Sequence, residues 1–150
     1  MLNPAQDGQT HINIYSKGRT ALGRGLSNFA YTPFTHPRDG RFASIEAYWY
    51  WLSTGSVNDT LRPLHGYTAK TEGRKSGPKV LVNEFEYQIE WAIYEKLWQT
   101  PALNIALANS TLPFTHYYCY GETKVVMPPN SEWLLQIFEE ARLQARFSLM

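Results

Sequence analysis

The chain has 150 residues, which is the length of one domain with a hydrophobic core of its own. Its formal net charge is only +1, which removes the electrostatic basis for tight binding to duplex nucleic acid. The composition is otherwise ordinary, apart from a high aromatic content of ten Tyr, seven Phe and five Trp.

The sequence carries no sign of secretion or of a membrane segment. Cys119 is the single cysteine, so an intramolecular disulfide is excluded. Residues 1–14 lack the basic-then-apolar pattern of a signal peptide, and no stretch is apolar for long enough to span a bilayer. We therefore expect a soluble, cytoplasmic protein without a membrane partner, and nothing in the sequence indicates its oligomeric state.

The first half of the chain predicts short strands followed by a helix. Residues 1–10 are polar and are expected to form a loose lead-in, with a single domain over 11–150. Alternation over 11–15 predicts a short strand. A second short strand is expected either at Phe34 or over 41–43, after the Asp39-Gly40 turn signal.

Ser44 is a suitable N-cap for the next helix, which Gly55 can end in a left-handed conformation. Apolar residues follow Ser44 at helical spacing, namely Ile45, Tyr48, Trp49 and Leu52. Short helical turns within a loop are expected over 58–77. Two helices then follow, one over 81–98 and one from Pro101 to Asn109. The chain is expected to be extended over 114–127, and residues 128–131 open a last helix. Together these elements predict a mainly helical α+β fold with a few short strands.

Glu46 is a lone carboxylate in the first turn of the helix that follows Ser44. The free N–H groups and the dipole at a helix N-terminus favour the charged form, so we expect a low pKa unless burial opposes it. Such a carboxylate suits the oxocarbenium-like state through which a glycosidic bond is hydrolysed. Acids also decorate helix N-termini for stability alone, and without further evidence that is the more common reason.

Two further segments could hold a ligand. Ser27, Asn28 and Phe29 offer an amide with both donor and acceptor and a ring that can stack on a base, although an Asn turn beside a buried Phe explains them equally. Lys70, Gly73 and Arg74 combine a point charge, a residue that allows a close turn and a bidentate phosphate partner, although such runs are usually solvated loops.

Other site chemistries are not indicated. The four histidines are scattered without metal-ligand spacing, so a zinc site is not expected. The sequence contains no phosphate-binding or dinucleotide glycine fingerprint and no nucleophile elbow, so no cofactor is expected. Tyr120-Gly121 is an aromatic-glycine element that can line a pocket.

Taken together, these segments resemble the YbiA-like family, also called NADAR for its link to NAD and ADP-ribose. The resemblance runs in order over most of the chain from about residue 12. The segments that carry it are Ile14-Tyr15, Leu26-Ser27-Asn28-Phe29, Ala43-Ser44-Ile45-Glu46-Ala47-Tyr48-Trp49, Ala69-Lys70 with Gly73-Arg74, Lys96-Leu97, the helix over 102–108, Tyr120-Gly121 and Asn130.

This resemblance implies a compact, single-domain, mainly helical α+β fold and a pocket for a ribose-phosphate ligand. Some members of the family are N-glycosidases acting on phosphoribosylamino intermediates of riboflavin synthesis, and others remove ADP-ribose from guanine. The implied catalytic residues are Glu46 and Lys70. The implied substrate-binding residues are Ser27, Asn28, Phe29, Tyr48, Gly73, Arg74, Tyr120, Gly121 and Asn130.

In more detail, the resemblance implies that Glu46 is the catalytic carboxylate, Asn28 a ribose or base anchor, and Arg74 a phosphate clamp. Phe29 and Tyr48 would be walls of the pocket. Lys70 either holds phosphate, which we rank first, or attacks an opened ribose as an amine. The partner would be a small nucleotide or ribose-phosphate, with ADP-ribosylated nucleic acid as a further option, and no metal or redox cofactor is implied.

The chain departs from the family pattern at three places. Ala47 stands where members usually have His, residues 116–121 lack the acids that commonly precede a Trp-Gly pair, and Pro128-Pro129 replaces a glycine-rich turn. We therefore carry an N-glycosidase as the leading hypothesis. The alternatives are a non-catalytic binder of ADP-ribose, NAD or a related nucleotide, and a structural domain whose aromatic residues are all core.

Overall fold

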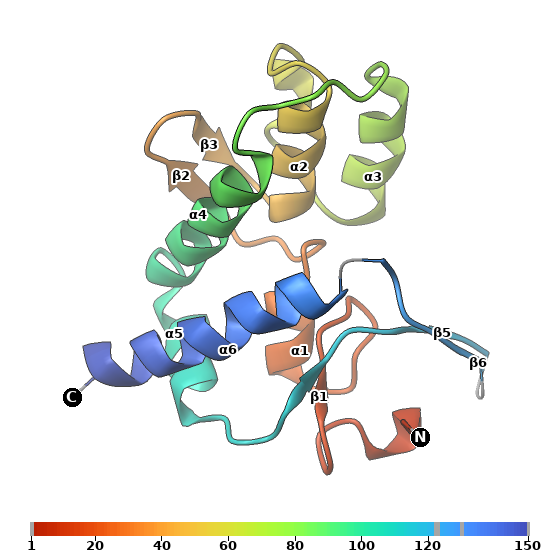
Figure 1. Ribbon diagram of the computed structural model, residues 1–150, viewed down its shortest axis with the longest axis vertical. Helices are drawn as coiled ribbons and strands as arrows, with labels where there is room; N and C mark the ends of the chain where they lie inside the picture. The colour runs from red at the N-terminus through yellow and green to blue at the C-terminus, as the bar shows by residue number, and fades with distance from the viewer. Residues whose placement is uncertain (1, 122–123, 130, 150) are drawn as a thin grey trace. The chain divides into compact units, whose positions relative to one another are not determined.

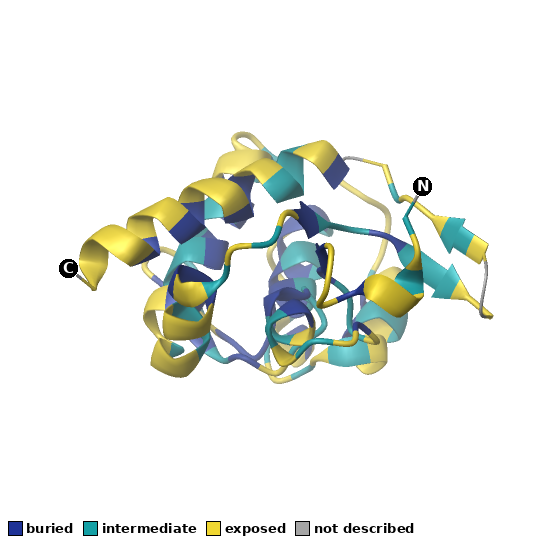
Figure 2. Ribbon diagram, turned by 90° about the horizontal axis from the view of Figure 1, so that it is seen from below, coloured by how far each residue is buried: buried dark blue, intermediate teal, exposed yellow. Residues whose placement is uncertain are grey.

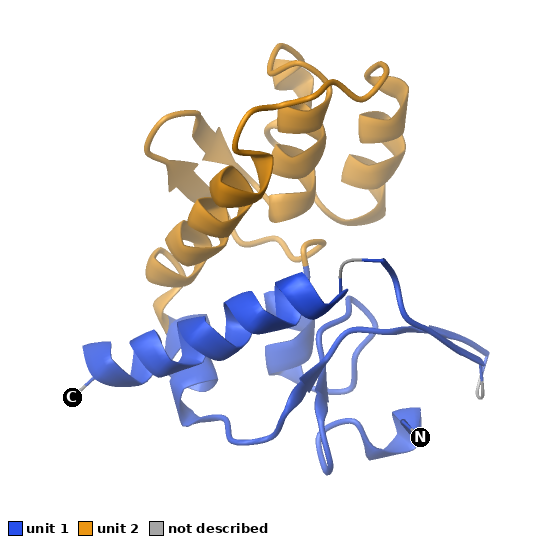
Figure 3. Cartoon of the chain, in the orientation of Figure 1, with its two compact units in different colours: residues 1–27, 102–150 blue, residues 28–101 orange. Residues whose placement is uncertain are grey.

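The computed structural model describes residues 2–121, 124–129 and 131–149 (Figure 1). The chain divides into two compact units, shown in different colours in Figure 3. Unit 1 combines the two ends of the chain, Met1–Ser27 and Ala102–Met150, and unit 2 is the continuous segment Asn28–Pro101. The described elements are mostly helices with small two-stranded sheets, so the expected mainly helical α+β fold is confirmed.

Unit 1 is built around two short parallel strands from opposite ends of the chain. Strand β1 (Ile12–Asn13) pairs with β4 (Phe114–Thr115), with Ile12 opposite Phe114. The other elements of the unit are η1 (Pro4–Gln6), α1 (Ala21–Leu26), α5 (Pro101–Asn109), the hairpin of β5 (Tyr118–Tyr120) and β6 (Lys124–Val126), and α6 (Ser131–Ser148). The strands and helices expected over 11–15, 101–109 and 114–127 and after 131 are therefore present.

Helix α6 is amphipathic, as its sequence indicates. It buries Ile137, Phe138 and Ala141 while other residues along the helix stay exposed, a pattern that is visible in Figure 2. Arg142 adds to this packing, because its guanidinium lies 4.2 Å from the centroid of the Phe114 ring and donates to the carbonyl of Leu112 at 2.8 Å.

The N-terminal segment is more structured than a loose lead-in. The carboxylate of Asp7 is buried and accepts from the backbone N–H groups of Asn13, at 2.9 Å, and Arg19, at 2.8 Å. Because a buried carboxylate is stable only when its oxygens are hydrogen-bonded, these bonds hold the segment against β1 and the loop after it.

Unit 2 begins with an antiparallel hairpin and continues through three helices. Strands β2 (Phe34–His36) and β3 (Gly40–Phe42) pair with Phe34 opposite Phe42, so strands form at both of the places between which the sequence left the choice open. Helix α2 (Ile45–Ser53) starts at the N-cap Ser44, whose hydroxyl accepts from the N–H of Ala47 at 3.1 Å. Gly55 follows α2 with φ of 110°, the left-handed conformation expected of it.

The remaining elements of unit 2 are η2 (Asp59–Leu61), α3 (Gly66–Lys75) and α4 (Phe85–Trp98). Helix α3 corrects the prediction of short helical turns within a loop over 58–77. Gly66 and Gly73 lower the intrinsic helix propensity of this segment, but packing against α2 outweighs that cost. Helix α4 starts four residues later than the predicted helix over 81–98.

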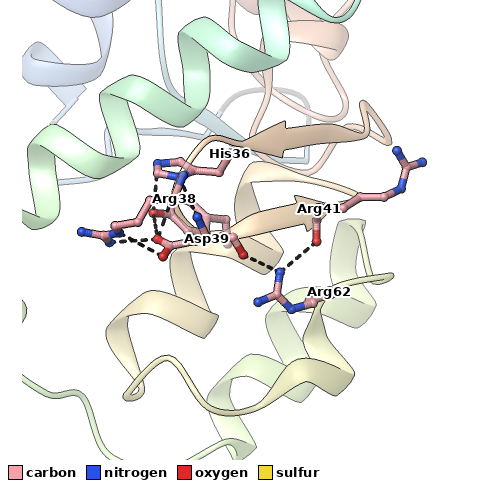
Figure 4. A network of polar contacts seen from close by, with 6 residues as sticks. His36, Arg38, Asp39, Arg41 and Arg62 are labelled. Atoms are coloured by element: carbon pink, nitrogen blue, oxygen red, sulfur yellow. Dashed lines mark hydrogen bonds and ion pairs between the residues drawn. The ribbon is translucent and has the colours of Figure 1, made fainter.

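The core of unit 2 is aromatic. Tyr48 is fully buried and its ring lies 4.8 Å from that of Phe42, with Phe34 and Trp51 also in ring contact. The guanidinium of Arg62 lies 4.4 Å from the centroid of the Phe42 ring. Arg62 also donates to the carbonyl oxygens of Asp39, at 2.7 Å, and Arg41, at 3.3 Å, which holds the hairpin against the loop after η2 (Figure 4).

Candidate functional site

The loop that starts at Asn28 is bonded to the first turns of both α2 and α3. Its Asn28 carbonyl accepts from the N–H of Glu46 at 3.0 Å, and its Phe29 carbonyl accepts from the N–H of Gly66 at 2.9 Å. The Ser44 hydroxyl also donates to the carbonyl of Leu64 at 2.9 Å, just before α3. These bonds place Phe29, Glu46 and the start of α3 beside one another.

Gly73 sets how closely α3 approaches α2. A Cβ atom added to Gly73 would lie 2.2 Å from Cγ of Tyr50, much closer than real contacts allow. The structure therefore corrects the role expected of Gly73 as a flexible turn before Arg74. Gly73 is a buried residue inside α3, and its missing side chain makes room for the Tyr50 ring.

Helix α3 presents two cations to Glu46. Lys70 and Arg74 are four residues apart and therefore lie on one face of α3. The positive charges of both residues act on the carboxylate of Glu46. The ammonium of Lys70 also lies 6.0 Å from the centroid of the Phe29 ring. The structure thus brings together four of the residues singled out in the sequence, and we call Phe29, Glu46, Lys70 and Arg74 the α2–α3 cluster.

The pKa of Glu46 differs from the expectation drawn from the sequence. Burial raises this pKa from its ordinary value of 4.5 to about 7, and the positive charges of Lys70 and Arg74 offset only part of the rise. Two N–H groups of the first turn donate elsewhere, that of Glu46 to the carbonyl of Asn28 and that of Ala47 to the hydroxyl of Ser44. Among the described residues, no hydrogen bond to the carboxylate opposes the effect of burial.

Tyr48 is a core residue and not the pocket wall that the resemblance implies. Its hydroxyl donates to Asp39 at 2.6 Å and lies 3.3 Å from Nε2 of His36. Nδ1 of His36 accepts from the N–H groups of Arg38 and Asp39, both at 3.1 Å, so Nε2 carries the proton when the ring is neutral. Figure 4 shows His36, Arg38 and Asp39 at the hairpin turn. Tyr48 therefore fixes the hairpin to α2.

Three other residues predicted from the sequence belong to unit 1. Ser27 ends α1 in unit 1 and is buried. Tyr120 is exposed at the end of β5, and Gly121 follows with φ of 70°, also in unit 1. Asn130 lies outside the described residues. Asn28 contributes its carbonyl, and the ligand-anchoring role of its side chain stays a prediction.

Tyr31 and His65 are two neighbours of the cluster that the sequence did not single out. Their ring centroids lie 5.1 Å apart, and both side chains are exposed. Tyr31 comes two residues after Phe29, and His65 immediately precedes Gly66, which is bonded to Phe29. The closeness of Tyr31 to the Asn28-Phe29 pair was the available signal, but only the fold brings His65 to it.

Comparisons with known proteins identify the fold. No protein-family model matches this chain, and no curated protein matches it in sequence. The NMR structure of the E. coli protein YbiA is similar to this chain with a TM-score of 0.67, over 99% of this chain and 89% of that one, at 19% sequence identity. The chain has a YbiA-like fold. This finding agrees with the resemblance in motifs and confirms the fold class expected from it.

The described residues contain neither a membrane-spanning helix nor a group of metal-binding side chains. None of its described helices is both long and apolar enough to cross a membrane. Over residues 2–121, 124–129 and 131–149, no three His, Cys, Asp or Glu side chains gather closely enough to hold a metal ion.

Proposed function

We propose that this chain is an N-glycosidase that hydrolyses an N-ribosyl bond in a nucleotide-like substrate. The observation that carries the proposal is the carboxylate of Glu46, which is partly buried in the first turn of α2, has its pKa raised to about 7 by that burial, and is acted on by the charges of Lys70 and Arg74. A carboxylate with a pKa near neutrality can both accept and release a proton at physiological pH, as a general base requires. A carboxylate that only stabilises a helix end has no need of this burial.

In the proposed reaction, Glu46 acts on the water that replaces the leaving base. The bond between the ribose C1′ and the base nitrogen breaks, and its electron pair leaves with the base, which takes up a proton from solvent. The positive charge that develops on the ribose is stabilised by the ionised carboxylate. Water then bonds to C1′ and gives one proton to Glu46, which returns that proton to solvent. The products are the free base or amine and a ribose with a hydroxyl group at C1′.

The remaining members of the α2–α3 cluster suit the substrate's other groups. Arg74 is exposed and free to bind a phosphate in a bidentate manner. Lys70 is half-buried beside Phe29, and we assign it to phosphate binding ahead of attack on an opened ribose. Phe29 provides a ring for contact with the sugar or base. The two substrate classes are ADP-ribosylated guanine or its nucleotides and phosphoribosylamino-pyrimidines, as the family resemblance implies.

The second candidate is a protein that binds ADP-ribose, NAD or a related nucleotide without turnover. It is favoured by Ala47 in place of the family's His and by the absence of acids over 116–121. Under this alternative, Arg74, Lys70 and the aromatic residues keep their binding roles, and Glu46 has no acid–base role.

The test is to incubate the purified protein separately with ADP-ribosyl-guanosine, NAD, ADP-ribose and a ribosylaminopyrimidine phosphate. Mass spectrometry would detect released base or amine, and thermal shift would detect binding. We expect Glu46→Gln to lower turnover by about 100-fold or more, the size typical of a lost general base, while ligand binding is kept. Glu72→Gln is the matched control, because Glu72 is an exposed carboxylate on α3.

The two candidates predict different results in this test. Base release that is lost in Glu46→Gln and kept in Glu72→Gln supports the glycosidase. A thermal shift with one ligand and no product from any of the four supports the binding protein. Arg74→Ala should weaken binding under both candidates, and unchanged binding in this variant would show that Arg74 is not a phosphate clamp.

A further inference from the structure

Tyr31 and His65 form an exposed aromatic pair next to the α2–α3 cluster. Their rings are 5.1 Å apart at an interplanar angle of 58°, and 61% of Tyr31 is exposed. His65 is the N-cap of α3, yet its side chain makes no capping hydrogen bond. Neither ring therefore carries the core packing or the helix capping that usually accounts for a Tyr or an N-cap residue.

The backbone holds this pair in place beside the cluster. The N–H of Gly66 donates to the carbonyl of Phe29 at 2.9 Å, so the residue after His65 is fixed to a residue two before Tyr31. The N–H of Glu46 holds Asn28 in the same way. The loop at Asn28 and Phe29 is thus bonded both to Glu46 in the first turn of α2 and to Gly66, next to His65, while the ammonium of Lys70 lies 6.0 Å from the centroid of the Phe29 ring.

We propose that Tyr31 and His65 form a stacking subsite for the planar leaving base of the substrate. This proposal rests on the proposed function and extends it to the choice of substrate. Exposed aromatic rings beside cations suit a ligand that joins a planar base to a phosphate, because the base stacks on the rings while the phosphate binds the cations. The subsite selects substrates whose leaving group is a flat heteroaromatic ring over those with an aliphatic amine.

The proposal separates two parts of one ligand, so it can be tested with two non-reacting probes. Guanosine 5′-monophosphate carries base, ribose and phosphate, and ribose 5-phosphate lacks the base. We expect Tyr31→Ala and His65→Ala each to weaken binding of the nucleotide by roughly tenfold, within the range for lost base stacking, as measured by isothermal titration calorimetry. Binding of ribose 5-phosphate should not change in either variant.

Matched variants make the result specific. Tyr31→Phe keeps the ring and should bind the nucleotide like the wild type. Tyr87→Ala removes a tyrosine of similar exposure, 58%, from α4 and should change neither affinity. Arg74→Ala should weaken the binding of both probes, because both carry a phosphate.

Each proposal can fail without the other. If Tyr31→Ala and His65→Ala bind the nucleotide as tightly as the wild type, or if the wild type binds both probes equally, the stacking subsite is wrong. The proposed function would still stand on Glu46-dependent turnover. If instead Glu46→Gln keeps full turnover while Tyr31→Ala weakens only the nucleotide, the assigned catalytic role fails and the stacking subsite holds.

Discussion

Unit 2 contains two partly buried carboxylates beside positive charges, and they behave in opposite ways. Asp39 accepts two hydrogen bonds from Arg38, at 2.9 and 2.8 Å, and one from Tyr48. Burial would raise its pKa, but these hydrogen bonds and the charge of Arg38 outweigh burial and lower the pKa. Glu46 has Lys70 and Arg74 nearby, yet burial prevails and its pKa rises to about 7.

The two carboxylates differ in that Asp39 accepts hydrogen bonds from its cation and from Tyr48, whereas only the charges of Lys70 and Arg74 oppose burial at Glu46. The Asp39 carboxylate is fully engaged, so it stabilises the hairpin and has little capacity left for a ligand. Glu46 has cations near it but is not bonded to them, which leaves both the carboxylate and the cations able to interact with a substrate. This difference separates a structural carboxylate from a candidate catalytic one.

The largest effect is expected from Gly73→Ala, which would break the close approach of α3 to Tyr50 of α2. The added Cβ overlaps the Tyr50 ring, and overpacking of this kind costs about 3 kcal/mol in free energy of unfolding. Urea denaturation would measure it, with Glu72→Ala on the exposed face of α3 as control. A gain of about 1 kcal/mol, as helix propensity alone predicts, would show that α2 and α3 do not pack at this glycine.

A smaller change in the free energy of unfolding is expected when either Glu46 or Asp39 is made neutral. The change should have opposite signs in the two variants. The folded-state pKa of Glu46 lies above the unfolded value of 4.5, so ionisation costs stability as pH rises through about 7. Glu46→Gln should therefore be more stable than the wild type at pH 8, by on the order of 2 kcal/mol, and equally stable at pH 4. Thermal unfolding at the two pH values would measure the difference.

Asp39→Asn is the opposite case and serves as the comparison. The folded-state pKa of Asp39 lies below its unfolded value of 3.8, so its stabilisation is present above that value and is lost as pH falls through the folded-state pKa. Asp39→Asn should lose on the order of 1–3 kcal/mol at pH 8, and less in strong acid. A loss of stability in both variants at pH 8 would contradict the distinction between the two carboxylates.

The smallest effect is expected from Lys70→Met, which sharpens the account of Glu46. The charge of Lys70 lowers the pKa of Glu46 more than the charge of Arg74 does, so removal of Lys70 should raise that pKa further. The alkaline shift would be measured in the pH–rate profile, or by NMR titration of the Glu46 carboxyl carbon. Lys75→Met is the control, because Lys75 is exposed and pairs with Glu72 at 3.7 Å. An equal shift of the Glu46 pKa in both variants would mean that Lys70 acts on Glu46 no more strongly than an exposed lysine elsewhere on α3.

Local patterns in the sequence determined much of the fold. Ser44 and Gly55 mark the start and end of α2 because N-capping and left-handed backbone depend on the residues at those positions. The apolar spacing over 131–148 predicts the buried side of α6 in the same way. The Ser-Asn-Phe and Ser-x-Glu segments, together with Lys70 and Arg74, identified the residues that the structure brings together around Glu46.

Only the tertiary structure decided what those residues can do. The pKa of Glu46 depends on burial and on the charges of Lys70 and Arg74 from α3, and the place of Tyr48 depends on rings from β2 and β3. A local pattern contains neither. Gly73 reads as a flexible residue until the Tyr50 ring is seen beside it. His65 joins Tyr31 through a bond between residues 66 and 29. Burial and long-range contact are properties of the packed chain, so the chemistry of this site was decided by the fold.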